Sequence, residues 1–402
     1  FQALTGNAPF PWQCALYERF LADRTDNIPA SCNLPTGLGK TSVIAVWLVA
    51  LATRPDKVPR RLVYVVNRRT VVDQTTTEVE KYRDALTPET PLANALWELC
   101  ALRPEKPDPK KDRPLAISTL RGQYADNREW SADPARPAVI CGTVDMIGSR
   151  LLFSGYGCGF KTRPLHAGFL GQDALIVHDE AHLEPAFQKL ILAIEDEQRN
   201  GRTPDFRPLR VMELTATSRA GGETPFGLTD EDFKNTTVTQ RVRANKALHL
   251  HENKDEKKLA DELASLALGF KNSQKAILVF VRKVDDVGTI VAKLQKDKQH
   301  VQQLTGTLRG LERDRMADPR RADGCPIFAR FLKPPKENAP ENERWNVKPT
   351  QGTVYLVCTS AGEVGVNISA DHLVCDLSTF DSMAQRFGRV NRFGTCEGTQ
   401  IH

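Results

Sequence analysis

The sequence predicts an α/β protein built from two lobes, each with a parallel β-sheet. Short, almost uniformly apolar runs alternate with longer amphipathic runs, a pattern typical of buried parallel strands that are connected by helices. The alternation stops in a polar, glycine-containing stretch at residues 219–256 and then starts again. We therefore expect a boundary near residue 245, with a first lobe at residues 1–245 and a second lobe at residues 246–402.

The composition is that of a globular chain. Its 402 residues are 40% hydrophobic and 26% charged, and no apolar run is long enough to cross a membrane. Nine cysteines without a Cys-x-x-Cys pair predict reduced thiols, and the N-terminal residues lack the features of a signal peptide. The net charge of +5 is too small to demand nucleic acid but allows a local basic track. We expect a cytoplasmic monomer that binds no membrane.

A glycine loop, LPTGLGKT at residues 34–41, connects a short strand to an apolar helix at residues 42–52. In P-loop nucleotide-binding proteins, the backbone N–H groups of such a loop face phosphate, the lysine pairs with the β and γ phosphates, and the hydroxyl binds Mg²⁺. Leu34 stands where the strict pattern has glycine, and a turn that only caps the helix is the alternative. The expected nucleotide contacts are Thr36, Gly37, Leu38, Gly39, Lys40 and Thr41.

Gln13 precedes this loop by about 25 residues, near the start of an amphipathic helix. Its amide can both donate and accept a hydrogen bond, which suits the edge of adenine and rejects guanine. A glutamine that faces water at a helix start is the alternative. Because a glycine loop follows, we favour the adenine interpretation.

Arginines and threonines follow several predicted strands. Open α/β sheets bind ligands at the carboxyl ends of their strands, where such side chains can contact the phosphates of one nucleic-acid strand. Solvated loop residues are the alternative for each residue taken singly. The candidate nucleic-acid contacts are Arg68, Arg121, Thr143 and, in the second lobe, Thr359.

An apolar strand at residues 174–177 leads into two adjacent carboxylates, Asp179 and Glu180. Burying both is costly unless a cation or a reaction uses them. Asp179 can hold Mg²⁺ through water, while Glu180 can orient and deprotonate an attacking water. A nuclease metal centre made by Asp179 with His178 and His182 is the alternative, but it needs further ligands that the sequence does not offer at a recognisable spacing.

Two further segments lie near the end of the second lobe. In CTSAGEVGVNIS, residues 358–369, small residues around Gly365 and Asn367 allow a phosphate or ribose to approach closely. In QRFGRVNRFG, residues 385–394, helical spacing predicts that Gln385, Arg389 and Arg392 share one face of a helix. Arginines presented in this way to phosphates on another lobe act as arginine fingers. An exposed basic helix is the alternative.

Together these segments resemble superfamily 2 helicases and, within them, the helicase-nuclease effectors of type I CRISPR systems. The resemblance covers nearly the whole chain and follows the family order. It rests on PWQ at residues 11–13, LPTGLGKT, NRRTVVDQ, STLRGQ, GTVDMI, DEAH at residues 179–182, TAT, LVFVRK, CTSAGEVGVNIS and QRFGRVNRFG. The segments LRG, GTVDM, SRLLFSGYG and QRFGRVNR look closest to the subtype I-G (formerly I-U) effectors.

The resemblance implies two tandem RecA-like lobes that bind ATP and Mg²⁺ in the cleft between them. It also implies 3′ to 5′ movement along single-stranded DNA, recruitment by a guide-RNA surveillance complex, and a histidine–aspartate nuclease domain. Because the one His-Asp dipeptide lies in the DEAH segment, we expect this chain to be the helicase portion only. Many relatives carry aspartate where this chain has Asn367.

Two alternatives to a CRISPR helicase stay open. One is a DEAH-type helicase or translocase of DNA repair or restriction. The other is a nucleotide-gated clamp that binds DNA without unwinding it.

Overall fold

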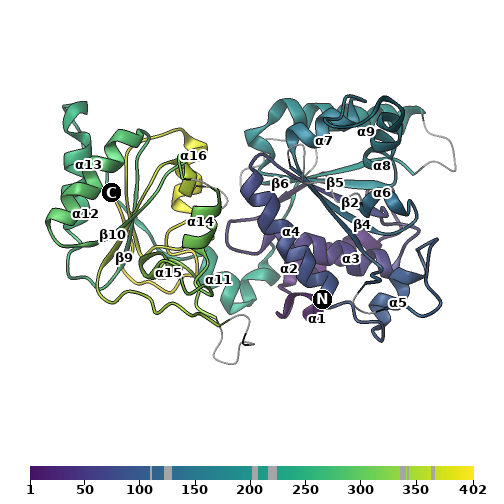
Figure 1. Cartoon of the computed structure of the whole chain (residues 1–402), viewed down its shortest axis with the longest axis horizontal. Helices are drawn as coiled ribbons and strands as arrows, with labels where there is room; N and C mark the ends of the chain where they lie inside the picture. Colours follow the sequence, from purple (N-terminus) through teal and green to yellow (C-terminus); the bar gives the residue numbers. More distant parts are fainter. Residues whose placement is uncertain are drawn as a thin grey trace. The chain divides into compact units, whose positions relative to one another are not determined.

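In the computed structural model the chain folds into two compact units, Phe1–Val238 and Thr239–His402. The structure describes residues 1–108, 111–121, 129–201, 207–215, 224–308, 310–335, 341, 344–363 and 367–402. In each unit, helices cover both faces of a β-sheet (Figure 1). The boundary expected near residue 245 therefore falls inside the second unit.

The first unit contains, within its described residues, a seven-stranded sheet in the order β3-β4-β2-β5-β6-β1-β7. Its strands are β1 (Ser31–Asn33), β2 (Arg61–Val66), β3 (Ala116–Leu120), β4 (Ala138–Thr143), β5 (Ala174–Asp179), β6 (Arg210–Thr215) and β7 (Phe226–Gly227). Every neighbouring pair is parallel. The carboxyl ends of all these strands therefore lie along one edge of the sheet, and the loops that follow them can build one site.

Alternation along β2 explains how one strand serves two cores. Leu62 and Tyr64 join a buried cluster on one face, whereas Val63 and Val65 join a cluster on the other. Successive side chains of a strand point to opposite faces, so a strand buried on both faces is apolar throughout. The helices of the described residues of this unit are α1 (Gln2–Thr5), α2 (Pro11–Leu21), α3 (Val43–Thr53), α4 (Arg69–Asp84), α5 (Pro91–Trp97), α6 (Glu129–Ala132), α7 (Val144–Leu151), α8 (Arg163–Gly171), α9 (Pro185–Gly201) and α10 (Asp230–Lys234). Helix α11 (Thr236–Val242) crosses the boundary between the two units.

The second unit contains, in the part that the structure describes, a six-stranded sheet in the order β10-β11-β9-β12-β13-β8, again parallel throughout. The strands are β8 (Ala247–Leu248), β9 (Ala276–Phe280), β10 (His300–Leu304), β11 (Val354–Cys358), β12 (His372–Cys375) and β13 (Gln400–Ile401). The helices are α12 (Leu259–Leu268), α13 (Val284–Lys296), α14 (Gly310–Ala317), α15 (Pro326–Ala329) and α16 (Phe380–Phe387). The predicted class, two α/β lobes with parallel sheets, is confirmed.

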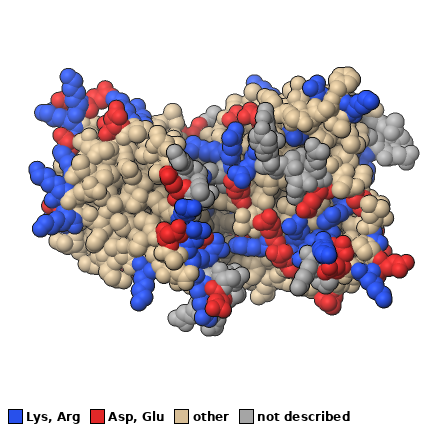
Figure 2. Space-filling view, viewed as in Figure 1, with Lys and Arg blue, Asp and Glu red and all other residues tan. Residues whose placement is uncertain are grey.

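The surface carries both signs of charge. On the visible face of the first unit, Lys and Arg alternate with Asp and Glu (Figure 2), as the small net charge of +5 suggests. No helix among the described residues is both long and apolar enough to span a membrane.

Candidate functional site

The glycine loop begins directly after β1. The amide of Leu34 donates to the carbonyl oxygen of Thr215 (3.0 Å), and the Leu34 side chain is fully buried in the core. Leucine thus stands at the first motif position because that position packs inside the sheet. Gly37 and Gly39 have φ angles of 91° and 74°, in the left-handed region that favours glycine. The loop then enters a short 3₁₀ turn, Lys40–Ser42, which leads into α3.

Lys40 meets Glu180 at the carboxyl edge of the first sheet. The ammonium group of Lys40 donates to Glu180 Oε1 at 3.3 Å, and the two side chains are only 9% and 17% exposed. The residues lie 140 positions apart in the chain, so their pairing depends on the parallel order of β5, β6 and β1. The structure thus brings together the predicted phosphate-binding lysine and the predicted general base.

Asp179 ends β5 beside this pair. The hydroxyl of Tyr64 donates to Asp179 Oδ2 (2.8 Å), whereas Asp179 Oδ1 and Glu180 Oε2 are buried without a hydrogen-bond partner among the described residues. Burial, and then the Glu180 carboxylate, raises the pKa of Asp179 to about 6, against the opposing effects of Lys40 and Tyr64. A buried carboxylate oxygen without a partner is costly, and a bound cation would remove that cost.

The oxygen groups at this edge fit Mg²⁺. Thr41 interacts with the same Tyr64 hydroxyl that binds Asp179, so the threonine hydroxyl and the carboxylate lie near one another. Hydroxyl, carboxylate and water oxygens are the ligands that Mg²⁺ prefers. His178 turns away from this group, because its Nδ1 lies 2.6 Å from Gln188 Oε1. Among the described residues, no group of three or more His, Cys, Asp or Glu side chains has the arrangement of a metal site.

Glu180 has a left-handed backbone, with φ at 53°, and its amide donates to the carbonyl oxygen of Leu214 (2.9 Å). Its Oε2 lies 3.6 Å from His182 Nδ1, and that nitrogen lies 3.5 Å from Thr215 Oγ1. A polar chain therefore runs from the expected base to the end of β6. Residues 216 and 217 of the TAT segment lie outside the described part of the chain.

Gln13 lies against the glycine loop. Its Oε1 accepts from the amide of Phe10 (2.7 Å) and its Nε2 donates to Ser42 Oγ (2.5 Å), while the Ser42 hydroxyl donates to the carbonyl oxygen of Gly39 (2.6 Å). The side chain is 5% exposed. Both ends of the Gln13 amide thus form hydrogen bonds within the protein. An adenine base would have to replace Phe10 and Ser42 as its partners.

Three of the expected nucleic-acid contacts lie at the ends of neighbouring strands β2, β4 and β3. Arg68 precedes α4, and Thr143 ends β4 with 8% exposure. Arg121 follows β3 and forms an ion pair with Asp73 (2.7 Å). The fourth, Thr359, follows β11 in the second unit and is 6% exposed. The residues lie at carboxyl edges as expected, but the charge of Arg121 is already offset.

The helix α16 ends at Phe387, and Gly388 caps it, so the expectation that Gln385, Arg389 and Arg392 share one helical face is wrong. Only Gln385 belongs to the helix. Beyond Gly388 the backbone leaves the helical path, with Asn391 at a φ of 43°. Helical spacing fails here because the helix stops before it reaches Arg389 and Arg392.

Tertiary contacts hold the two arginines instead. The guanidinium of Arg389 donates through Nε and Nη2 to the carbonyl oxygen of Glu363 (3.0 and 2.8 Å). The amide of Arg392 donates to Ser369 Oγ (3.1 Å), and burial lowers the pKa of the Arg392 side chain. Asn367 is exposed, and Gly365 lies outside the described residues.

A buried charge network that sequence reasoning missed supports this region. Arg386 is 1% exposed and pairs with Glu363 Oε1 (2.8 Å) and Asp376 Oδ1 (2.9 Å). Glu363 thus binds Arg386 through its side chain and Arg389 through its carbonyl group. A carboxylate among small and apolar residues, as Glu363 is in the sequence, signals a buried partner, but it does not identify that partner.

Two family profiles match the sequence. The type III restriction enzyme, res subunit, matches residues 7–220, which is more than half of the chain, and the C-terminal part of the CRISPR-associated nuclease/helicase Cas3 matches residues 273–395. The chain belongs to the type III restriction enzyme res subunit family. It is a nucleic-acid-dependent ATPase of the superfamily 2 helicase type, related to Cas3, and the prediction of such an enzyme is confirmed.

Solved helicase structures share the fold of this family member. It is similar to S. cerevisiae Dbp5 bound to RNA and ADP BeF3 (18% identity, 98% of this chain and 83% of that chain, TM-score 0.51). It is also similar to T. fusca Cas3-AMPPNP (14%, 100% and 47%, TM-score 0.60) and to the DUF1998 helicase MrfA bound to DNA (14%, 97% and 45%, TM-score 0.58). These likenesses confirm two RecA-like lobes. No curated protein matches the sequence significantly.

We predict that Asp179→Asn stabilises the nucleotide-free chain at neutral pH. The raised pKa means that the folded state holds a proton more tightly than the unfolded state, whose Asp has a pKa of 3.8. Ionisation of Asp179 therefore lowers the free energy of unfolding by about 3 kcal/mol as the pH rises from about 4 through 6. Thermal unfolding in EDTA should show a higher Tm for the variant at pH 8 and no difference at pH 3.5. The exposed Asp196→Asn variant is the control, and an unchanged Tm at pH 8 contradicts the buried charge.

We predict that Gly394→Ala destabilises the second unit by more than about 1 kcal/mol. Gly394 has a φ of 68°, and an added Cβ would collide with the carbonyl oxygen of Gln240. Gly398 is a matched control, since its φ is 67° but a Cβ there meets nothing within 4 Å. Urea unfolding should therefore show a larger loss for Gly394→Ala than for Gly398→Ala. Equal losses would mean that backbone strain alone acts at both sites.

Proposed function

We propose that this chain is the motor of a helicase that hydrolyses ATP to move 3′ to 5′ along single-stranded DNA in type I CRISPR interference. The observation that carries the proposal is the ion pair between Lys40 and Glu180 beside Asp179, at the carboxyl edge of the first sheet. The match of residues 273–395 to the Cas3 C-terminal family supports the CRISPR assignment.

In the proposed site the glycine loop binds the phosphates of ATP. The left-handed glycines 37 and 39 turn the backbone so that N–H groups can face an anion, and Lys40 exchanges Glu180 Oε1 for phosphate oxygens. Gln13 recognises adenine after leaving Phe10 and Ser42. The remaining expected contacts are Thr36, Leu38, Gly365 and Asn367.

Thr41 and Asp179 would hold Mg²⁺, which neutralises charge on the phosphates when it is bound. Glu180 is the proposed general base. Once Lys40 turns to phosphate, Glu180 Oε1 loses its ion pair, and Oε2 already has no hydrogen-bond partner among the described residues. A carboxylate with both oxygens available can orient a water and take its proton.

The second unit would supply the arginine fingers. We propose that Arg389 and Arg392 stabilise the charge on the transferred phosphate, and that Gln385 helps to orient the water. The guanidinium group of Arg389 now donates to the carbonyl oxygen of Glu363, which it would exchange for phosphate. DNA would lie along Arg68, Arg121, Thr143 and Thr359, with Arg121 exchanging Asp73 for a phosphate.

A strand-displacement assay tests this proposal. Duplexes with a 3′ or a 5′ single-stranded overhang, in DNA and in RNA, are mixed with the chain and either ATP or a nonhydrolysable analogue. We expect displacement only with ATP and only from the 3′-overhang DNA. Tight DNA binding with the analogue but no displacement with ATP would instead identify a nucleotide-gated clamp.

A translocase of DNA restriction is the second candidate, and the match of residues 7–220 to the restriction subunit family favours it. The two candidates differ in recruitment. A CRISPR motor should turn over ATP faster when a guide-RNA surveillance complex holds an open target, compared with the same DNA alone. A restriction translocase should respond equally to both.

A further inference from the structure

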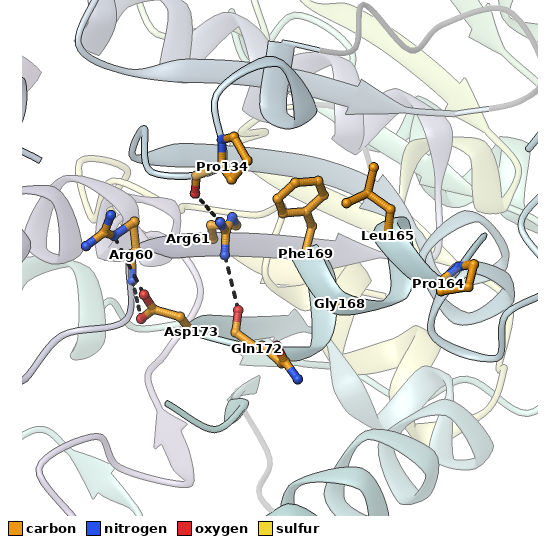
Figure 3. Close-up of a pocket in the computed structure, with 9 residues that line it drawn as sticks. All are labelled: Arg60, Arg61, Pro134, Pro164, Leu165, Gly168, Phe169, Gln172 and Asp173. Atoms are coloured by element: carbon orange, nitrogen blue, oxygen red, sulfur yellow. Dashed lines mark hydrogen bonds and ion pairs between the residues drawn. The ribbon is translucent and has the colours of Figure 1, made fainter. Parts of the chain in front are cut away.

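A pocket lies at the amino-terminal edge of the first sheet, opposite to the edge of the candidate nucleotide site. Arg61 begins β2 and is in register with Ala138 and Ala174, the first residues of β4 and β5. Helix α8 and the segment before β4 line the space beside them, about 400 Å³ (Figure 3). Its lining consists of Arg60, Arg61, Pro134, Pro164, Leu165, Gly168, Phe169, Gln172 and Asp173.

Arg61 is a buried cation in this pocket. It is 7% exposed, donates to the carbonyl oxygens of Pro134 and Gln172, and stacks its guanidinium 4.9 Å from the centre of the Phe169 ring (Figure 3). Its Nε has no hydrogen-bond partner within the described residues. Carbonyl dipoles and an aromatic face offset the charge only in part, because a buried cation normally pairs with a carboxylate.

The nearby carboxylate serves other arginines. Asp173 Oδ2 lies 3.6 Å from Arg60 Nε, and its Oδ1 lies 3.2 Å from Arg207 Nε. Among the described residues Arg61 forms no ion pair of its own. Asp173 is the one acidic side chain in the pocket lining, and Asp173 and Asp133 attract Arg61 only from beyond ion-pair distance. The pocket therefore keeps an excess of positive charge that an anion from outside can neutralise.

The rim of the pocket is apolar and basic. Residues 146–172 contain no Asp or Glu but include Lys161 and Arg163, while the third basic residue, Arg150, is buried. Large apolar side chains of the same segment face solvent, at exposures from 50% to 83%. They are Leu152, Phe153, Tyr156, Phe160 and Leu165. Leu165 lies in the pocket lining itself, so this exposed segment and the pocket are continuous. A group of exposed apolar side chains of this kind marks an interaction surface.

We propose that this surface docks a partner protein through a segment in which a Glu or Asp carboxylate neighbours apolar side chains. The carboxylate enters the pocket and pairs with Arg61, while the apolar side chains cover Phe160 and Leu165. Nucleic acid fits less well, because its phosphates lie on the outside of a broad backbone whereas Arg61 is buried, with 7% exposure. The surface also lies away from the carboxyl edge, where the nucleotide and DNA contacts are proposed, so it does not rest on the proposed function.

Selection from a random 12-residue peptide library displayed on phage tests the chemistry of this surface. We expect enriched peptides that place Glu or Asp beside Leu, Ile or Phe, and synthetic copies that bind in solution. Binding should fall at least tenfold when the acid becomes its amide, and also in the Arg61→Lys and Phe160→Ser variants. Phe160→Ser changes an 83% exposed side chain, so it leaves the fold and basal ATP turnover unchanged.

The matched control is Leu250→Ser, which changes a side chain that is also 83% exposed but belongs to the second unit. It should bind the selected peptides like the unmodified chain. Peptides without an acidic preference, or with equal affinity for the Phe160→Ser variant, overturn the proposal. A labelled single-stranded dT oligonucleotide is the second probe. If its binding weakens tenfold in Phe160→Ser, the surface is a nucleic-acid site and the proposal fails.

Discussion

The Glu180→Gln variant should bind ATP like the unmodified chain but lose DNA-stimulated turnover by a factor of about 10²–10⁴. Glutamine keeps the shape of the side chain and a hydrogen-bond acceptor for Lys40, which now approaches Glu180 Oε1 at 3.3 Å. It cannot take a proton from water. The measurement is the rate of phosphate release at saturating DNA, together with the Kd for a fluorescent ATP analogue.

Glu197→Gln is the control for this change, because Glu197 is an exposed residue of α9 and lies outside the proposed site. It should turn over ATP normally. Turnover by Glu180→Gln at the rate of the unmodified chain would remove Glu180 as the base. If ATP binding is lost as well, Glu180 instead acts by holding the glycine loop in place through Lys40.

The Arg389→Ala variant should slow ATP hydrolysis by about 10³–10⁵, with little loss of ATP affinity, if Arg389 is the arginine finger. Alanine removes a cation that we propose acts on the transferred phosphate. Within the protein, the change removes two hydrogen bonds that the Arg389 guanidinium donates to the carbonyl oxygen of Glu363. Single-turnover hydrolysis measures the chemical step, and an unchanged rate excludes the role.

Arg386→Leu separates this catalytic role from a structural one. Its removal leaves the buried Glu363 carboxylate without a cation and Asp376 with Arg282 alone, and breaking a buried pair in this way costs about 3–5 kcal/mol. Urea unfolding should therefore show a large loss for Arg386→Leu and a small one for Arg389→Ala. If Arg389→Ala loses as much stability as Arg386→Leu, its slow hydrolysis results from unfolding and not from the loss of an arginine finger.

Local patterns carried much of the prediction. The strands of both units are short apolar runs. A strand buried on both faces of a sheet must be apolar throughout, as Leu62 to Val65 show, so it can be predicted from the sequence. The glycine loop and the two carboxylates after β5 are also local, because each is set by a strand end. What the sequence could not supply is which strand ends become neighbours, so the ion pair of Lys40 and Glu180 appears only in the fold.

The second unit shows where spacing misleads. Regular spacing placed Arg389 and Arg392 on a helix, but Gly388 ends that helix, and contacts to Glu363 and Ser369 from an earlier segment fix the arginines. Arg386 was overlooked because a charged residue within a helix predicts exposure unless its buried partners are known. Gln13 likewise gave no sign that Ser42 would hold its amide.

The most direct test of the motor is the rate of ATP turnover with Mg²⁺, in the presence and absence of single-stranded DNA, for the full chain and for Lys40→Ala. We predict that DNA raises turnover several-fold and that Lys40→Ala abolishes turnover under both conditions. A rate that is the same with and without DNA, or that survives in Lys40→Ala, would contradict the assignment of this chain as a DNA-driven ATPase built around Lys40 and Glu180.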